Sequence, residues 1–138
     1  PEDFPVRVSM ETRWSDNDMF GHLNNAVYFE LFDTAINGWL ARQTATAPLE
    51  QTARGVVAET SCRYLQEVGF PETVVVGIAV ERLGTKSVTY ALGLFRDPAD
   101  GASLAAVGRW VHVYVDPGTQ ATVAVPPAIR SALEAVTR

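Results

Sequence analysis

The hydrophobic positions between Val27 and Leu40 recur every three to four residues, which places their side chains on one face of an α-helix. Within this span and its flank they are Tyr28, Leu31, Phe32, Ala35, Ile36 and Trp39. Either Asn24 or Asn25 can cap the start of the helix, because an asparagine side chain accepts a hydrogen bond from a free N–H of the first turn. The pattern therefore predicts a long buried helix that begins near residue 25.

Residues 6–14 alternate between apolar and polar side chains, a period of two that is typical of a half-buried β-strand. Four further strands are predicted at about 56–67, 73–83, 86–96 and 103–115, with turn-forming residues between them. The turns are Gly69 to Pro71, Gly84-Thr85 and Asp97 to Gly101. Links this short favour antiparallel pairing of consecutive strands.

The remaining segments are connections and a terminal helix. Residues 41–54 contain Pro48 and lose their periodicity, which indicates a loop with room for a short helical turn. Pro126 and Pro127, followed by Ile129 and Leu133, predict a short helix at the end of the chain. One strand, a long helix and four long strands make an α+β domain, in which a twisted sheet can curl around the helix. At 138 residues, we expect a single domain over 1–138.

The bulk composition narrows the class of protein. Hydrophobic residues make up 47% and charged residues 20%, which is typical of a soluble globular protein and excludes a disordered chain. No apolar run approaches the roughly 20 residues that span a bilayer, and the first residues do not form a signal peptide. We therefore expect a cytoplasmic protein without a membrane partner. A net charge of −5 argues against nucleic acid as a partner.

Cysteine and histidine usage excludes several kinds of chemistry. Cys62 is the only cysteine, and its strand-like flanks indicate a small core residue rather than a nucleophile. The two histidines lie far from it, so no metal-ligand spacing is present. The motif G-x-S-x-G is also missing, which leaves a serine-hydrolase triad without its anchor. We expect chemistry that uses no metal.

Asp16, Asp18 and His22 form a dense polar cluster just before the predicted helix. Free N–H groups at a helix N-terminus can hold an oxyanion, and a carboxylate beside them can act as a base or a nucleophile. This combination indicates acyl chemistry. The alternative is that the aspartates cap turns, His22 bonds a carbonyl and the asparagines only start the helix.

The run from Trp14 to Tyr28 reads W-S-D-x-D-x-x-G-H-x-N-N-x-x-Y. It resembles the hotdog-fold acyl-CoA thioesterases, specifically the 4-hydroxybenzoyl-CoA thioesterase-like family. The resemblance is strongest over Arg13 to Tyr28 and extends more weakly to about Val115. It implies a hotdog fold, with a long central helix wrapped by a five- or six-stranded antiparallel sheet. It also implies homodimers that join their sheets edge to edge, often paired into homotetramers.

The resemblance assigns roles to four residues of the motif. Asp18 matches the catalytic aspartate of one branch, which acts as a nucleophile or as a base for water. The N–H of Asn25 would polarise the thioester carbonyl. His22 and Asn24 would shape the pocket and position water or the thioester.

A second branch of the family uses a glutamate within the central helix, for which Glu30 and Asp33 are the candidates here. Because the pocket in family members lies between subunits, Thr60, Ser61 and Arg63 could reach a neighbour's site. Acyl specificity would depend on which of four aromatic residues line the pocket. Those residues are Trp39, Phe32, Tyr64 and Phe70.

The expected reaction is hydrolysis of an acyl-CoA to a free acid and CoA, in which coenzyme A is part of the substrate rather than a cofactor. Its phosphates would meet Arg82 and Lys86, which flank the Gly84 turn, and Arg63 near a strand end. Two alternatives remain open: hydrolysis of acyl chains on acyl carrier protein, and non-catalytic binding of an acyl thioester. The first would need a basic face, which the net charge disfavours.

Overall fold

The computed structural model describes residues 3–97 and 103–138 and contains five strands and two α-helices. The strands are β1 (Val6–Glu11), β2 (Arg54–Tyr64), β3 (Thr73–Leu83), β4 (Ser87–Arg96) and β5 (Leu104–Val115). The helices are α1 (Asn25–Thr44) and α2 (Pro127–Glu134), and single 3₁₀ turns lie at Trp14–Asp16 and Pro48–Glu50. The predicted α+β class, the long helix and the short terminal helix are confirmed.

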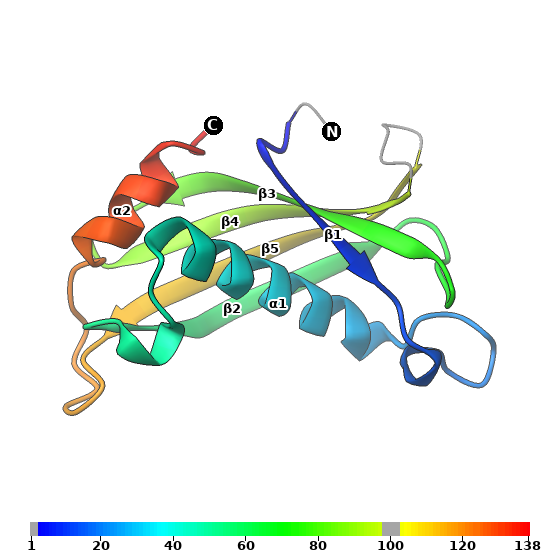
Figure 1. Cartoon of the computed structure of the whole chain (residues 1–138), viewed down its shortest axis with the longest axis horizontal. Helices are drawn as coiled ribbons and strands as arrows, with labels where there is room; N and C mark the ends of the chain where they lie inside the picture. Colours follow the sequence, from blue (N-terminus) through cyan, green and yellow to red (C-terminus); the bar gives the residue numbers. More distant parts are fainter. Residues whose placement is uncertain (1–2, 98–102) are drawn as a thin grey trace.

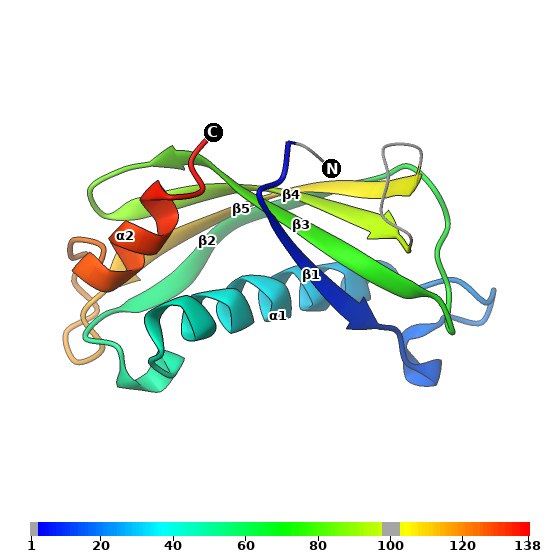
Figure 2. The ribbon, with the colours of Figure 1, turned by 45° about the horizontal axis from the view of Figure 1, so that its top comes forward.

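The strands form one antiparallel sheet in the order β1-β3-β4-β5-β2, so that β1 and β2 are its edges. Helix α1 lies along one face of this sheet, and α2 lies at the end where α1 finishes (Figures 1 and 2). The predicted pairings of β3 with β4 and of β4 with β5 are confirmed. Residues 98–101 of the predicted turn before β5 lie outside the described residues.

The predicted pairing of the second strand with the third is wrong, because β2 pairs with β5 at the far edge of the sheet. The connection 65–72 does not form a hairpin, since its polar groups bond the loop before α1 instead. Val68 O accepts from Leu23 N at 2.7 Å, and Phe70 N donates to Asn17 Oδ1 at 2.9 Å. This connection therefore joins the sheet to the start of the central helix.

Two element boundaries also differ from the pattern-based prediction. β1 ends at Glu11 rather than near residue 14, because Trp14–Asp16 turn into a 3₁₀ helix. α1 continues past residue 41 to Thr44 and ends where Ala45 adopts a left-handed conformation with φ 53°. The short helical turn expected within 41–54 is present at Pro48–Glu50.

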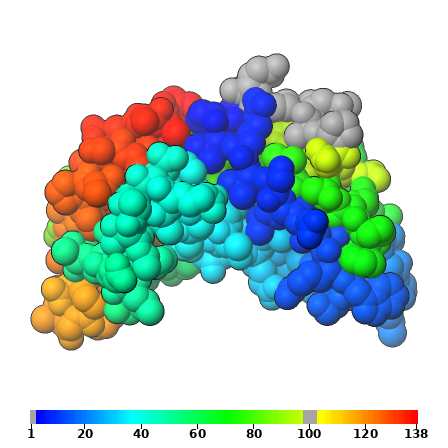
Figure 3. Space-filling model, in the orientation of Figure 1, coloured from blue at the N-terminus to red at the C-terminus, as the bar shows by residue number. Residues whose placement is uncertain are grey.

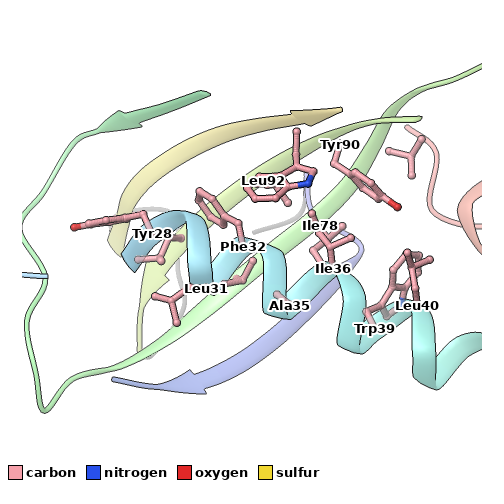
Figure 4. Packing of buried hydrophobic residues seen from close by; sticks show 14 of the residues in the cluster. Tyr28, Leu31, Phe32, Ala35, Ile36, Trp39, Leu40, Ile78, Tyr90 and Leu92 are labelled. Atoms are coloured by element: carbon pink, nitrogen blue, oxygen red, sulfur yellow. The ribbon is translucent and has the colours of Figure 1, made fainter. Parts of the chain in front are cut away.

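Helix α1 begins with Asn24 as its N-cap, whose side chain accepts from Ala26 N at 3.0 Å. Its buried face points at the inner face of the sheet, where Leu31, Phe32 and Ile36 meet strand residues (Figure 4). Phe32 is fully buried and packs so close to Gly108 that a Cβ there would lie 2.8 Å from its ring. Phe32 therefore holds α1 close against β5.

The sheet leaves one long edge open. β2 has 11 residues and is exposed over most of its length, including both Val56 and Val57. In the space-filling view the molecule is hollowed along the side where α1 lies, between the loop before α1 and the segment around Pro48–Glu50 (Figure 3). Neither helix in residues 3–97 and 103–138 is long and apolar enough to cross a membrane.

Candidate active site

The loop of residues 17–23 is closed by its own hydrogen bonds and docked on the connection 65–72. Asn17 and Leu23 form an isolated antiparallel bridge, and Asp18 N donates to His22 O at 2.8 Å. Gly21 has φ 82°, a left-handed conformation that favours glycine. Gly69 approaches so closely that a Cβ on it would lie 2.5 Å from Gly21 O. The loop is therefore held in one shape beside the start of α1.

Asp18 uses one of its two carboxylate oxygens to hold this loop. Oδ1 accepts from Phe20 N at 2.8 Å and from His22 N at 3.3 Å, the pattern of an aspartate that caps a turn. Within residues 3–97 and 103–138, no hydrogen bond to Asp18 Oδ2 is found. The side chain is half-buried and is oriented by the backbone while one oxygen stays available.

The first N–H of α1 is also available. The Asn24 side chain bonds the N–H of Ala26, the second helical residue, and so leaves the N–H of Asn25 unbonded within the described part of the chain. A free N–H at this position carries the positive end of the helix dipole. It can donate to an oxygen that gains negative charge.

Asp18 and Asn25 line the same cavity of about 310 Å³. Its other lining residues are His22, Leu23, Tyr28, Tyr64, Leu65, Gln66 and Glu67. The cavity is therefore formed by the loop, the first turn of α1, the end of β2 and the connection that follows it. Asp18 and Asn25 thus bring a carboxylate and the first residue of a helix to one cavity, and acyl transfer can use both kinds of group.

His22 is paired with Glu67, a residue that the sequence pattern did not single out. His22 Nε2 lies 3.1 Å from Glu67 Oε2, and both side chains remain partly exposed. The two residues are 45 positions apart and meet because the connection 65–72 passes beside the loop. No local motif marks this contact.

Tyr28 and Tyr64 form the inner wall of the cavity. Their rings meet edge to face with centroids 4.8 Å apart, and the Tyr64 hydroxyl donates to Asn25 O at 3.3 Å. Burial raises the pKa of Tyr28 to about 12, so its hydroxyl stays protonated near neutral pH. Figure 4 shows that hydroxyl pointing away from the core residues labelled along α1.

Asp16, the first aspartate of the D-x-D pair, has a different environment from Asp18. It is 2% exposed and accepts from Arg13 N at 2.7 Å and from the Arg13 guanidinium at 2.8 and 3.1 Å. Its backbone oxygen also accepts from Asn24 N at 2.9 Å. These contacts fix the chain just before α1, and they occupy both carboxylate oxygens.

The candidates for a helix-borne acid, Glu30 and Asp33, lie outside this cavity. Both are exposed on α1; Glu30 lies 3.6 Å from Arg13, and Asp33 accepts from Asn37 at 2.8 Å. They form side-chain pairs on the solvated face of the helix. Neither carboxylate lines the cavity that Asp18 lines.

The basic residues expected to meet phosphate are separated from Asp18 within one chain. Arg82 and Lys86 lie at the turn between β3 and β4, beside α2, whereas the Asp18 loop lies at the opposite end of α1 (Figure 1). α1 has 20 residues, which corresponds to a length of about 30 Å. Lys86 Nζ lies 3.4 Å from Thr122 Oγ1, and Arg82 is exposed.

The candidate residues on β2 divide between the two faces of the sheet. Thr60 is paired with Trp110 and shares its inner face, whereas Ser61 and Arg63 are paired with Arg109 and Val107 on the outer face. Arg63 is exposed there. Only part of this group can therefore face a site on the helix side of the sheet.

Of the four aromatic residues expected to line the pocket, only Tyr64 lines the Asp18 cavity. Phe32 and Trp39 are buried in the core beneath α1. Phe70 lies outside and packs edge to face on Trp14 with centroids 6.0 Å apart. Tyr28, which was not among those four, lies in the first turn of α1 and also lines the cavity.

Among residues 3–97 and 103–138, no group of three or more His, Cys, Asp or Glu side chains is arranged to hold a metal ion.

Comparison with known proteins identifies the class. A sequence model described as the thioesterase-like superfamily matches residues 12–133, and the chain belongs to that superfamily. Its hotdog fold is shared with solved thioesterase structures. Three of these are acyl-CoA thioesterases at 12% to 17% identity, a likeness that shows the fold alone.

Three known proteins are similar to this chain in sequence. The crystal structure of PA5185 from Pseudomonas aeruginosa strain PAO1 is 38% identical, with a TM-score of 0.92 over 99% of this chain and 94% of that one. PA2801, a putative thioesterase from the same organism, is 29% identical, with a TM-score of 0.83 over 91% of this chain and 95% of that one. The uncharacterized protein YsmA of Bacillus subtilis (strain 168) is 30% identical over 80 residues. That match covers 58% of this chain and 54% of YsmA, about half its length.

Proposed function

We propose that this protein is an acyl-CoA thioesterase that hydrolyses an acyl-CoA to a free acid and CoA, with Asp18 as its catalytic carboxylate. One observation carries the proposal: Asp18, whose Oδ2 has no hydrogen bond among the described residues, and Asn25, whose N–H has none there either, line one cavity. Membership of the thioesterase-like superfamily supports the reaction class.

The chemistry needs one base and one donor. In the general-base form, Asp18 takes a proton from water while the water oxygen attacks the thioester carbon. The carbonyl oxygen gains negative charge and accepts from the Asn25 N–H, which stabilises the transition state more than the ground state. The C–S bond then breaks, and the sulfur leaves with a proton as the CoA thiol. In the nucleophilic form, Asp18 attacks the same carbon, the C–S bond breaks, and CoA leaves as a thiolate that is then protonated. Water later hydrolyses the resulting anhydride to the free acid and restores Asp18.

His22 and Asn24 serve as positioning residues in this proposal. Asn24 caps α1 through Ala26 and so leaves the Asn25 N–H free. His22 lies in the cavity wall, held at one nitrogen by Glu67. Its other ring nitrogen can hold water or the thioester sulfur beside Asp18.

We further propose that the working form is a homodimer that joins two β2 edges. Two identical edge strands that pair antiparallel are related by a twofold axis. The Arg54 end of one β2 would then lie beside the Tyr64 end of the other. The antiparallel pairing therefore brings Arg82 and Lys86 of one copy towards the Asp18 loop of the other. There, their positive charges would meet the phosphates of CoA.

The experiment that tests the function is a thiol-reagent assay of CoA release from a panel of aryl, short, branched and long acyl-CoAs. We expect turnover on at least one class. Binding of acyl-CoAs without thiol release would contradict the enzyme proposal and indicate a passive acyl-thioester binder. Release from acyl carrier protein alone would contradict the CoA assignment.

A further inference from the structure

A second cavity lies at the end of α1 opposite the Asp18 loop of the same chain. It has a volume of about 110 Å³ and is formed by α1, the segment that follows it, the first residues of β2, the last residues of β5 and α2. Its apolar walls include Leu40, Leu49 and Ile129, and its polar residues include His112, Tyr114 and Arg54. The volume exceeds the 10–15 Å³ or so that a single water needs.

His112 is the unusual member of this wall. It is 2% exposed, and its Nε2 is 3.0 Å from the indole Nε1 of Trp110. An indole nitrogen can only donate, so Nε2 must be the acceptor and carries no proton. Burial lowers the pKa of His112 to about 4, which keeps the ring neutral near pH 7. The single ring proton is therefore on Nδ1.

That Nδ1–H is a buried donor without a hydrogen-bond partner in residues 3–97 and 103–138. Buried donors are nearly always satisfied in folded proteins, so an unsatisfied one marks a place where a ligand or water belongs. Nδ1 lies on the side of Gly55, since a Cβ added at Gly55 would be 3.4 Å from it and 3.2 Å from the Tyr114 ring. Gly55 lines the same cavity, and its missing side chain leaves the space beside Nδ1.

We infer that this cavity is a second ligand site, separate from the Asp18 cavity of the same chain, which takes a small apolar molecule bearing one hydrogen-bond-accepting oxygen. The oxygen accepts from His112 Nδ1–H, and the carbon body contacts Leu40, Leu49 and Ile129. Arg54 lies exposed at the same cavity and has no ion pair among the described residues, so an acidic oxygen is also accommodated.

The protein has two histidines, so the NMR resonances of the His112 ring can be followed individually. A ¹⁵N-labelled sample is titrated with phenol, with benzoate and with toluene, and the His22→Gln variant assigns the two rings. Phenol and toluene have nearly the same shape, and only phenol offers the oxygen. We expect phenol or benzoate to move the His112 Nδ1–H resonance and to bind roughly three- to tenfold more tightly than toluene, the value of one hydrogen bond.

Gly55→Ala is the variant that blocks the site, because its methyl group occupies the space beside Nδ1. Gly55 has no positive φ, so alanine fits its backbone, and the Tyr114 ring at 3.2 Å needs only a small shift. Gly118→Ala, in an exposed turn, is the control. We expect Gly55→Ala, unlike Gly118→Ala, to lose binding of the probe molecules. Its His112 and Trp110 resonances without a probe should match those of the wild type. An unmoved His112 resonance in the wild type, equal affinity for phenol and toluene, or equal binding by the two alanine variants would overturn the inference. All these readouts are independent of turnover, so they stand apart from the thioesterase proposal.

Discussion

His22 Nε2 lies 3.1 Å from Glu67 Oε2, which links the loop before the central helix to the connection after β2. Because the pair is partly exposed, its contribution to stability is small, but it fixes the direction of an imidazole at the cavity wall. The contact ties two segments that are distant in the sequence to one proposed site.

Glu67→Gln tests this positioning role. Loss of the carboxylate charge should lower kcat/KM by about two- to fivefold, the range set by a partly exposed pair, with little change in thermal stability. Glu81→Gln is the control, since it removes a similar surface pair, Glu81 with Arg109 at 3.4 Å, on the outer face of the sheet. Steady-state kinetics check this prediction. Equal kcat/KM values for Glu67→Gln and Glu81→Gln would exclude a positioning role for Glu67.

Cys62→Ala should preserve turnover. Burial raises the pKa of the Cys62 thiol, which disfavours the thiolate that a cysteine nucleophile needs. The side chain packs partly buried against the core, so we expect a loss of about 1 kcal/mol in the free energy of unfolding. Denaturant unfolding and the CoA-release assay check the two effects separately. A folded variant without turnover would restore a cysteine mechanism.

Stability should fall on acidification through His112. Its pKa is lowered from 6.5 to about 4 in the folded protein, so the unfolded chain binds a proton more readily at acidic pH. The stabilisation by this group is fully present above pH 6.5 and is lost as the pH falls towards 4, by about 3 kcal/mol in total.

His112→Gln removes this titration and keeps an oxygen that can accept from Trp110. Unfolding free energies measured between pH 7 and pH 4 should therefore fall less steeply in the variant than in the wild type. Parallel curves would show that His112 is not a buried neutral histidine.

The exposed β2 edge predicts self-association. An 11-residue edge strand with open N–H and C=O groups is a template for pairing, so light scattering should give a multiple of the 15.0 kDa chain mass. Val57→Lys places a cation on that edge and should shift the protein towards monomer with loss of activity. Ala124→Lys, on an exposed segment beside the β3–β4 turn, should not. A fully active monomer would contradict both the assembly and the shared-site proposals.

The central helix and the strand positions were predictable because both rest on local periodicity. The 3.6-residue spacing from Val27 to Leu40 corresponds to the buried face of α1, and all five strands are present. The partner of β2 was not predictable in this way, because pairing depends on where the connection 65–72 docks. The 3₁₀ turn at Trp14–Asp16 was also missed, since it is held by side-chain bonds between Arg13 and Asp16 rather than by a hydrophobic pattern.

The candidate site likewise contains residues that the sequence could predict and residues that it could not. Asp18, His22, Asn24 and Asn25 lie in one motif, and the structure brings them together at the start of α1. Glu67 and Tyr64 join them only through tertiary contacts. Arg82 and Lys86 were grouped correctly at one turn, but their distance from Asp18 within a chain follows from the direction of β3, which no local signal gives.

The most direct test of the account compares Asp18→Asn with Asp16→Asn on the best acyl-CoA, with thermal unfolding measured for both. Asparagine at 18 keeps an oxygen for Phe20 and His22, so the fold should persist while kcat falls by roughly 10²–10⁴-fold through loss of the base or nucleophile. Asp16→Asn weakens the buried contacts to Arg13 and should cost stability with a smaller change in kcat. An Asp18→Asn enzyme within about threefold of the wild-type kcat would mean that Asp18 only caps its turn and that the catalytic assignment is wrong.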